Sequence, residues 1–392
     1  MNDRRLPLSI YALPLVAAFM LPNLATPLME LWRQDIGFSS GMLTLIFVMY
    51  LGGLAPAFLL APSLGRLWGR RTTQILACVL GILSCAFYVF GVNIALLLVA
   101  RVLTGLCSGL ILVHGPSAVQ AMADSAEKAK ATFIATMGIA IGLAGGPLFA
   151  GFIAQWLPWP TKTVFVLMAA LLALSLLLIT TEPETTREKV TSWLPFSGLG
   201  SKSVRTIAAG LGAFGPGMTA AAIVLALSPT LLMGLGGPTG PLGAGLMAGG
   251  MYAMSPIAQS MVRKLRSMAH IRLSLGLIVL AMISFAFAVT SHNLPILILS
   301  AILMGAGQGI SNLGSFGLIH QEVTPDNVPG ATAVLSLGTY ASASIVPLAG
   351  GFLIDAQGLE SAGVYMALGV VVMVLIGAFF ARDSYVAAHG ES

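Results

Sequence analysis

The chain has 392 residues, of which 57% are apolar and only 8% are charged. A soluble globular domain carries roughly 25% charged residues, so this composition excludes an ordinary soluble protein. Apolar stretches of about 20 residues, the length that crosses a bilayer, recur from one end of the chain to the other. The sequence therefore predicts an all-α integral membrane protein with many spans, in which the backbone hydrogen bonds are satisfied inside each helix.

Twelve apolar stretches predict twelve membrane-spanning helices. The first is not expected to be a cleavable signal peptide, because it is too long, lacks a small-residue cleavage site and continues into further spans. Three cysteines all fall inside spans, so no disulfide framework is expected. The predicted spans cover residues 8–31, 41–63, 72–91, 94–117, 131–156, 162–181, 206–234, 243–262, 272–291, 294–319, 330–354 and 361–381.

Basic residues predict the orientation, because they accumulate on the cytoplasmic side of a membrane. With the N-terminus inside, all lysines and arginines except Arg33, Lys162 and Arg101 fall in cytoplasmic segments, which is 16 of 19. Both termini are therefore expected in the cytoplasm, and the protein in the cytoplasmic (inner) membrane of the cell. The net charge of +5 follows from this topology and does not indicate nucleic-acid binding.

The longest polar stretch, "TTEPETTREKVTSWLPFSGLGSKSVR", divides the spans into two sets of six. The two sets resemble one another at an offset of 200 residues: "SCAFYVFGVN" at 84–93 aligns with "SFAFAVTSHN" at 284–293. Duplicated halves with a central site are a common plan of transporters. We expect an N-terminal six-helix bundle (1–181), a cytoplasmic linker (182–205) and a C-terminal six-helix bundle (206–392).

The fifth predicted span contains "GIAIGLAGGPLFAG" at residues 138–151, with glycine at every fourth position. Gly138, Gly142 and Gly146 share one helical face, and Pro147 follows directly. Small residues on one face let helix backbones approach closely in a membrane. We expect this face to pack on a neighbouring span, with the other half of the molecule as the favoured partner, and to influence which side of a cavity opens.

Three segments together resemble the major facilitator superfamily, over essentially the whole chain. The stretch "PSLGRLWGRR" is similar to the family's G-x-x-x-D-R-x-G-R-R loop and places Gly69, Arg70 and Arg71. The stretch "LLLVARVLTGL" is similar to its R-x-x-Q-G motif, with Arg101 in place. The segment "GLAGGPLFAG" looks like the G-x-x-x-G-P motif of its proton-coupled exporters, with conformational residues Gly142, Gly146, Pro147 and Gly151.

The resemblance implies the major facilitator fold, two pseudo-symmetric six-helix bundles, and a likeness to twelve-span drug or metabolite:proton antiporters. The chain departs from the pattern where the family's Asp is Arg66 and its Gln is Thr104. A gating role for Arg70 and Arg71 and a simple orientation role are both open.

Arg101 is the one basic residue well inside a predicted span. A charge at that depth costs about 2.5–3.5 kcal/mol on insertion scales and marks a functional position by default. Ser108 shares its helical face. We expect Arg101 to face a central cavity and act in substrate binding or proton coupling; the alternative is a structural arginine bonded to backbone carbonyls.

Two further polar stripes are candidate substrate contacts. Asn23, Thr26 and Glu30 follow one face of the first span, and Glu30 is a candidate proton carrier unless it forms a solvated pair with Arg33. The tenth span carries a second stripe that is expected to face a cavity or a neighbouring helix, as substrate contacts or as interhelical hydrogen bonds. Its members are Gln308, Ser311, Asn312 and Ser315.

These features favour a secondary active exporter that works by alternating access and expels a small amphipathic drug or metabolite in exchange for protons. An uptake symporter or facilitator is the alternative. An enzyme is disfavoured because no Walker loop, H-E-x-x-H, G-x-S-x-G or Cys/His metal spacing is found. We expect no cofactor or metal, no nucleic-acid partner, and a monomer surrounded by lipid.

Overall fold

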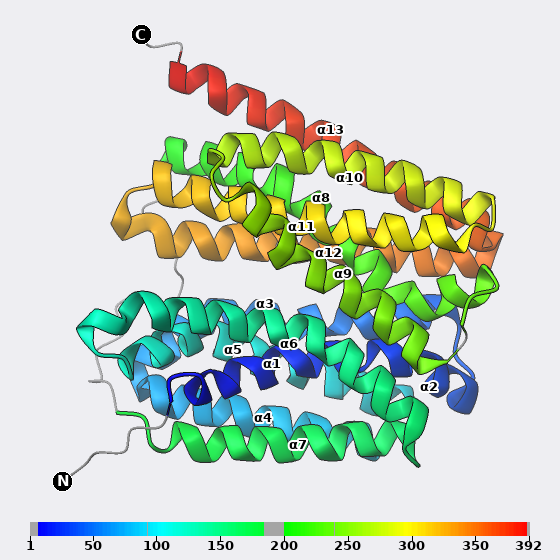
Figure 1. Cartoon of the computed structure of the whole chain (residues 1–392), viewed down its shortest axis with the longest axis horizontal. Helices are drawn as coiled ribbons and strands as arrows, with labels where there is room; N and C mark the ends of the chain where they lie inside the picture. Colours follow the sequence, from blue (N-terminus) through cyan, green and yellow to red (C-terminus); the bar gives the residue numbers. More distant parts are fainter. Residues whose placement is uncertain (1–6, 92, 184–199, 239, 390–392) are drawn as a thin grey trace. The chain divides into compact units, whose positions relative to one another are not determined.

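The computed structural model describes residues 7–91, 93–183, 200–238 and 240–389, and every element in these ranges is helical (Figure 1). The all-α fold class is therefore confirmed. Contacts divide the chain into two units, the first with Met1–Ile36 and Met49–Leu194, the second with Gly37–Val48 and Pro195–Ser392. Most of the linker predicted at 182–205 lies outside the described residues.

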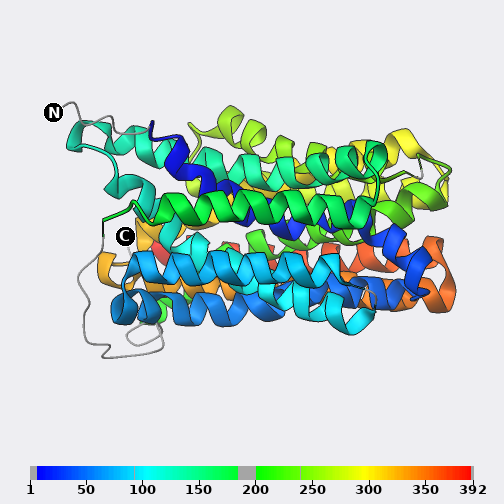
Figure 2. The same ribbon diagram turned by 90° about the horizontal axis from the view of Figure 1, so that it is seen from below.

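Unit 1 contains the helices of the first half, which run lengthwise beside one another (Figures 1 and 2). The long helix α3 begins in unit 2 and continues into unit 1. In chain order the elements are η1 (Ile10–Ala12), α1 (Leu13–Leu24), η2 (Thr26–Leu28), α2 (Met29–Ile36), α3 (Ser40–Trp68), α4 (Arg70–Val89), α5 (Ile94–Ala121), η3 (Ser125–Glu127), α6 (Lys128–Trp156) and α7 (Pro160–Ile179).

Unit 2 contains the helices of the second half. Its elements are α8 (Ser201–Gly234), α9 (Pro241–Val262), α10 (Ser267–Thr290), α11 (Leu294–Glu322), η4 (Pro325–Asn327), α12 (Val328–Gln357) and α13 (Leu359–His389). In the described ranges, eleven helical segments are long and apolar enough to cross a membrane. The predicted eighth span is the helix α9, whose many glycines give it a lower hydropathy.

The first predicted span is broken in the structure. α1 ends at Leu24, a short 3-10 turn follows, and α2 starts at Met29. Two prolines explain the break, because Pro22 and Pro27 have no N–H to donate to the carbonyl four residues earlier. The prediction of one continuous helix over residues 8–31 therefore does not include this interruption.

The repeat is visible in matching helix starts. Asn93 caps α5 by accepting a 3.0 Å hydrogen bond from the amide of Leu96. Asn293 caps α11 in the same way, with the amide of Ile296 at 3.1 Å. A capping asparagine satisfies an amide that has no partner inside the helix. The two halves, aligned at the offset of 200 residues, therefore share the start of this helix as well as similar amino acids.

The glycine face of α6 packs on α1, and the two helices lie side by side (Figure 1). A Cβ added at Gly142 would lie 2.7 Å from the Val16 carbonyl oxygen, and one at Gly146 would lie 2.7 Å from the Met20 carbonyl oxygen. Both helices belong to unit 1. The expectation that this face packs on the other half is therefore wrong; α6 remains helical through the buried Pro147 and Gly151.

Replacing Gly146 with alanine should destabilise the protein, because the new methyl group meets the backbone of Met20. Overpacking of this kind costs about 1–3 kcal/mol. Gly145→Ala is the matched control, since nothing lies within 4 Å of a Cβ at Gly145. Thermal unfolding in detergent should show a lower Tm for Gly146→Ala only; equal Tm values for both variants would contradict the contact with α1.

Candidate functional site

Two polar side chains of α5 bind backbone carbonyls of α1. The Arg101 guanidinium donates through Nη1 to the carbonyl oxygen of Pro22 at 2.7 Å. The Ser108 hydroxyl donates to the carbonyl oxygen of Ala18, also at 2.7 Å. Both side chains are buried, and Arg101 is only 1% exposed. The prediction that Arg101 and Ser108 share one face of this span is confirmed by their common partner.

These two carbonyls are the ones that lose their helical donors. Pro22 has no N–H, so the carbonyl of Ala18 lacks its usual partner four residues later. α1 ends at Leu24, which leaves the Pro22 carbonyl among the last carbonyls of the helix. An unpaired backbone group costs several kcal/mol in hydrocarbon, on the order of a lost hydrogen bond. α5 therefore supplies the donors that the broken first span needs.

The surroundings of Arg101 are aromatic. Tyr88 of α4 and Tyr50 of α3 are its electrostatic neighbours. The Tyr88 ring stacks on Phe165 of α7 with ring centres 4.1 Å apart, and on Trp32 of α2 at 5.5 Å. Helical spacing in the sequence does not reveal this stack, because its three rings come from three separate helices.

The remaining polar residues of the first span are placed as follows. The Asn23 side chain donates to the Phe19 carbonyl oxygen at 2.9 Å, and Thr26 is buried. Glu30 lies 3.7 Å from Arg33, oxygen to nitrogen. This is the ion pair that the sequence analysis gives as the alternative to a proton carrier.

The polar stripe of α11 divides between two environments. Ser315 donates to the Gly210 carbonyl oxygen of α8 at 2.8 Å, which is an interhelical hydrogen bond. Ser311 donates within its own helix to the Gln308 carbonyl oxygen at 2.9 Å. Gln308 is buried and Asn312 is half-buried. Of the four, Gln308 and Asn312 are therefore the better candidates for contact with a cargo.

A second cluster forms where α4 begins and α7 has ended. Gly69 precedes α4 with φ of +88°, a backbone conformation that only glycine adopts freely. Glu182 is 3% exposed; it accepts a 3.0 Å hydrogen bond from Gln74 and lies 3.7 Å from Arg70. Arg70 also donates to the Ser117 carbonyl oxygen of α5 at 3.3 Å. The loop lacks the family's carboxylate, and Glu182 supplies one from the segment that follows α7.

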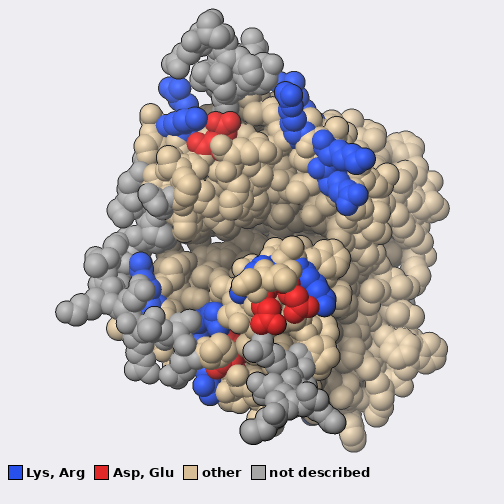
Figure 3. Space-filling model, turned by 60° about the vertical axis from the view of Figure 1, so that its left-hand side comes forward, with Lys and Arg blue, Asp and Glu red and all other residues tan. Residues whose placement is uncertain are grey.

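Burial raises the pKa of Glu182 above its usual value, and the neighbouring Arg70 acts in the opposite direction. A carboxyl group whose pKa is raised on folding binds its proton more tightly in the folded protein. Other charged pairs lie at helix ends within each unit, such as Lys130 with Glu127 and Lys202 with Glu322, both at 3.1 Å. Figure 3 shows Lys and Arg side chains beside Asp and Glu side chains on the face that it presents.

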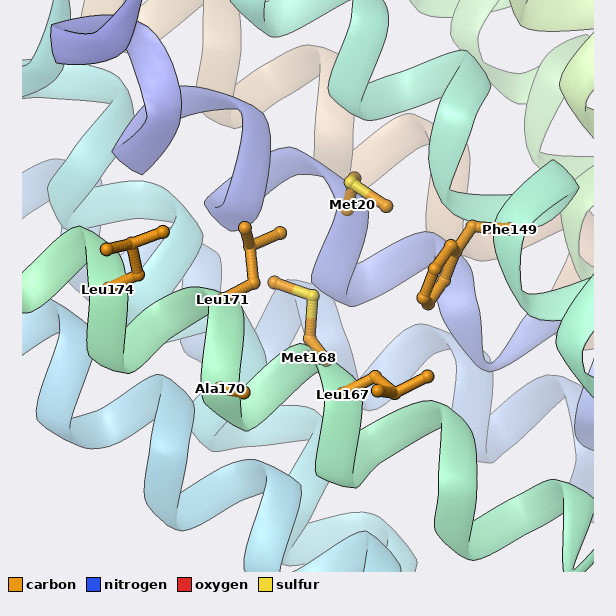
Figure 4. Close-up of a pocket in the computed structure, with 7 residues that line it drawn as sticks. All are labelled: Met20, Phe149, Leu167, Met168, Ala170, Leu171 and Leu174. Atoms are coloured by element: carbon orange, nitrogen blue, oxygen red, sulfur yellow. The ribbon is translucent and has the colours of Figure 1, made fainter.

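An apolar groove of about 380 Å³ lies between α1, α6 and α7 in unit 1 (Figure 4). Two of its residues, Leu167 and Leu174, are exposed, so the groove opens onto the surface. No polar side chain lines it, and it therefore has no group that could orient a polar cargo. The lining residues are Met20, Phe149, Leu167, Met168, Ala170, Leu171 and Leu174.

No group of three or more His, Cys, Asp or Glu side chains in the described ranges could hold a metal ion. His114 is buried and its Nε2 lies 2.9 Å from the Ala61 carbonyl oxygen of α3. His114 thus packs between two helices, α5 and α3.

Comparison with known proteins gives one family. The family model described as Major Facilitator Superfamily matches residues 12–312 and 273–392. No curated protein matches the sequence significantly.

The chain is also similar to solved structures that share its fold. A bacterial homologue of the human lysosomal transporter Spinster, in an inward-facing and unoccupied conformation, has 13% identity and a TM-score of 0.74, with 96% of each chain covered. The nucleoside transporter NupG has 12% identity and a TM-score of 0.74, covering 95% of this chain and 99% of its own. A D-xylose-proton symporter has 18% identity and a TM-score of 0.72, covering 94% and 96%.

Removing the Arg101 side chain should destabilise the protein, because the Pro22 carbonyl then loses its charged donor inside the bundle. Hydrogen bonds to charged groups contribute about 1.5–3 kcal/mol. Thermal unfolding in detergent should rank Arg101→Ala below Ser108→Ala, and both below the wild type. Arg33→Ala, at a half-buried pair, is the control with little change. A wild-type Tm for Arg101→Ala would contradict the structural role.

Glu182 should make stability depend on pH. Because its pKa is raised on folding, folding takes up a proton between its ordinary pKa of 4.5 and the higher folded value. The free energy of unfolding should therefore fall as pH rises through this window and level off above it. Glu182→Gln should remove that slope, whereas Glu127→Gln at an exposed pair should keep it. An unchanged slope in Glu182→Gln, measured by unfolding against pH, would contradict the assignment.

Proposed function

The chain belongs to the major facilitator superfamily, and from this premise we propose that it is a secondary active transporter that exports a small amphipathic drug or metabolite in exchange for protons, by alternating access. Members of this family are multi-pass membrane transporters and not enzymes. They bind small-molecule substrates. The direction, the coupling ion and the class of cargo are what the proposal adds.

One observation carries the proposal: a single segment of α1 is contacted both by the α6 motif that resembles one of proton-coupled exporters and by Arg101 of the family motif in α5. Gly142 and Gly146 of α6 approach its backbone between Val16 and Asn23. Arg101 binds the Pro22 carbonyl oxygen in the same segment. Because α6 packs directly on this segment, a movement of α6 would carry with it the carbonyl that Arg101 holds. This links a conformational motif to the buried charge.

In this proposal the cargo contacts lie on the first, fourth and tenth spans. Arg101 and Glu30 are assigned to proton coupling, with Arg101 changing its partner when a cargo or a proton arrives. Gly69, Arg70 and Arg71 would control switching through the cluster around Glu182. The proposed cargo contacts are Asn23, Thr26, Arg101, Ser108, Gln308, Ser311, Asn312 and Ser315.

Two observations support a second candidate, an uptake symporter or facilitator: the placement of the carboxylates favours a facilitator, and one similar structure is a symporter. In the described helices the carboxylates lie toward the helix ends, as Glu30, Asp355 and Glu360 do. A carboxylate in mid-membrane is the usual proton carrier of pumps and transporters. One of the similar structures is a proton symporter. For either candidate we propose a monomer in the cytoplasmic membrane, with both termini in the cytoplasm.

Purified protein in liposomes distinguishes the candidates. Radiolabelled tetraphenylphosphonium, ethidium, D-xylose and adenosine are added outside, with the membrane potential clamped by valinomycin and potassium. Antiport predicts accumulation of one probe when the interior is acidic, with at least a tenfold loss, or about 1.4 kcal/mol, in Arg101→Ala.

Accumulation driven by an acidic exterior would replace the proposal by symport, and equilibration without any effect of pH would replace it by facilitated transport. Glu30→Gln tests the second assigned residue: unchanged proton-driven accumulation in this variant removes Glu30 from coupling. Lys162→Gln, an exposed residue outside the proposed contacts, is the control.

A further inference from the structure

The start of α3 is attached to α12 by a carboxylate. Residues Gly37–Val48 belong to unit 2 by their contacts, although α3 continues into unit 1 from Met49. Within unit 2, the two carboxylate oxygens of Asp355 accept hydrogen bonds from the backbone amides of Ser40 at 2.8 Å and Gly41 at 2.7 Å. One side chain of α12 thus satisfies two successive amides at the beginning of α3.

The chemistry of this contact is favourable. The first four amides of an α-helix have no partner within the helix, and the helix dipole places partial positive charge there. A carboxylate that accepts two such hydrogen bonds combines both effects. The Ser39 hydroxyl accepts from the Met42 amide at 3.3 Å, so the next amide is satisfied locally. Asp355 therefore accepts from the Ser40 and Gly41 amides, whereas the Met42 amide is paired with a neighbouring side chain.

Close packing surrounds the contact. A Cβ at Gly351 would collide with the Thr44 hydroxyl and lie 2.7 Å from the Ser40 carbonyl oxygen. A Cβ at Gly41 would collide with the Phe352 ring. Thr44 is completely buried. The two glycines therefore leave room for the Phe352 and Thr44 side chains to pack against the backbone of the facing helix.

We propose that Asp355 is a latch residue that holds the start of α3 on α12 and must release it when the transporter changes conformation. α3 belongs to both units, so a movement of unit 1 against unit 2 acts on this attachment. The opposite end of α3 runs into Arg66, Gly69 and Arg70 and carries no carboxylate. The contact of α3 with a carboxylate is thus the one that Asp355 makes at the start of the helix. The inference rests on the alternating access in the proposed function, but not on the cargo, the direction or the coupling ion.

Accessibility of Thr44 tests the latch. Thr44→Cys is labelled with a hydrophilic maleimide in detergent, without cargo or gradient; the native Cys78, Cys85 and Cys107 are buried and give little background. Adding Asp355→Ala should raise the labelling rate at least tenfold. Asp355→Asn keeps one acceptor oxygen and should fall between the wild type and alanine. Glu360→Gln, whose partner is His292 at 2.8 Å, is the matched control and should leave the rate unchanged.

The number of labelled cysteines separates release from unfolding. Release predicts one reactive cysteine per chain in Asp355→Ala, whereas unfolding would also expose the three native ones. If the Asp355→Ala protein unfolds, the labelling rate in the milder Asp355→Asn variant tests the latch instead. Labelling at the rate of the parent Thr44→Cys protein in folded Asp355→Asn and Asp355→Ala would overturn the latch. Because no cargo is present, this failure is distinguishable from a failure of proton exchange in liposomes.

Discussion

The two backbone carbonyls of α1 that lack helical donors, one because of Pro22 and one because the helix ends, are the constraint on which the first half depends. In water such a carbonyl would bind solvent, but inside a membrane another part of the protein must serve it. Arg101 and Ser108 of α5 do so at 2.7 Å each. The cost of burying the Arg101 guanidinium is offset only because it meets a strong acceptor. The unpaired Pro22 carbonyl of α1 and the buried charge of α5 therefore each supply the hydrogen-bond partner that the other needs.

Close packing against α6 fixes α1 from a second side. The glycine face of α6 brings two backbones together, and proline at position 147 does not interrupt the helix. Polar bonds on one side and van der Waals contact on the other fix the same segment around Met20 and Pro22. A segment fixed in this way moves as a unit with α5 and α6, which suits a conformational change between discrete states.

The second half repeats the helices without repeating this chemistry. The position 200 residues after Arg101 is Ala301, and the interhelical bond of α11 is made by a neutral side chain, Ser315, to the Gly210 carbonyl oxygen of α8. The buried or bound carboxylates also differ: in unit 1 Glu182 lies with Arg70, and in unit 2 Asp355 binds the start of α3. The shared architecture therefore carries two different sets of polar contacts.

The sequence alone determined the helical membrane fold, the number of long segments and the repeat, because hydrocarbon requires each span to satisfy its own backbone. It also placed Arg101 and Ser108 on one face, since helical spacing is fixed. Only the tertiary structure decided which atoms they meet. The Arg101 bond joins residues 79 positions apart, and the Asp355 bond to Ser40 joins residues 315 apart. Spacing within a helix cannot say which helix lies opposite, and for this reason the α6 partner was predicted wrongly and Glu182 was missed.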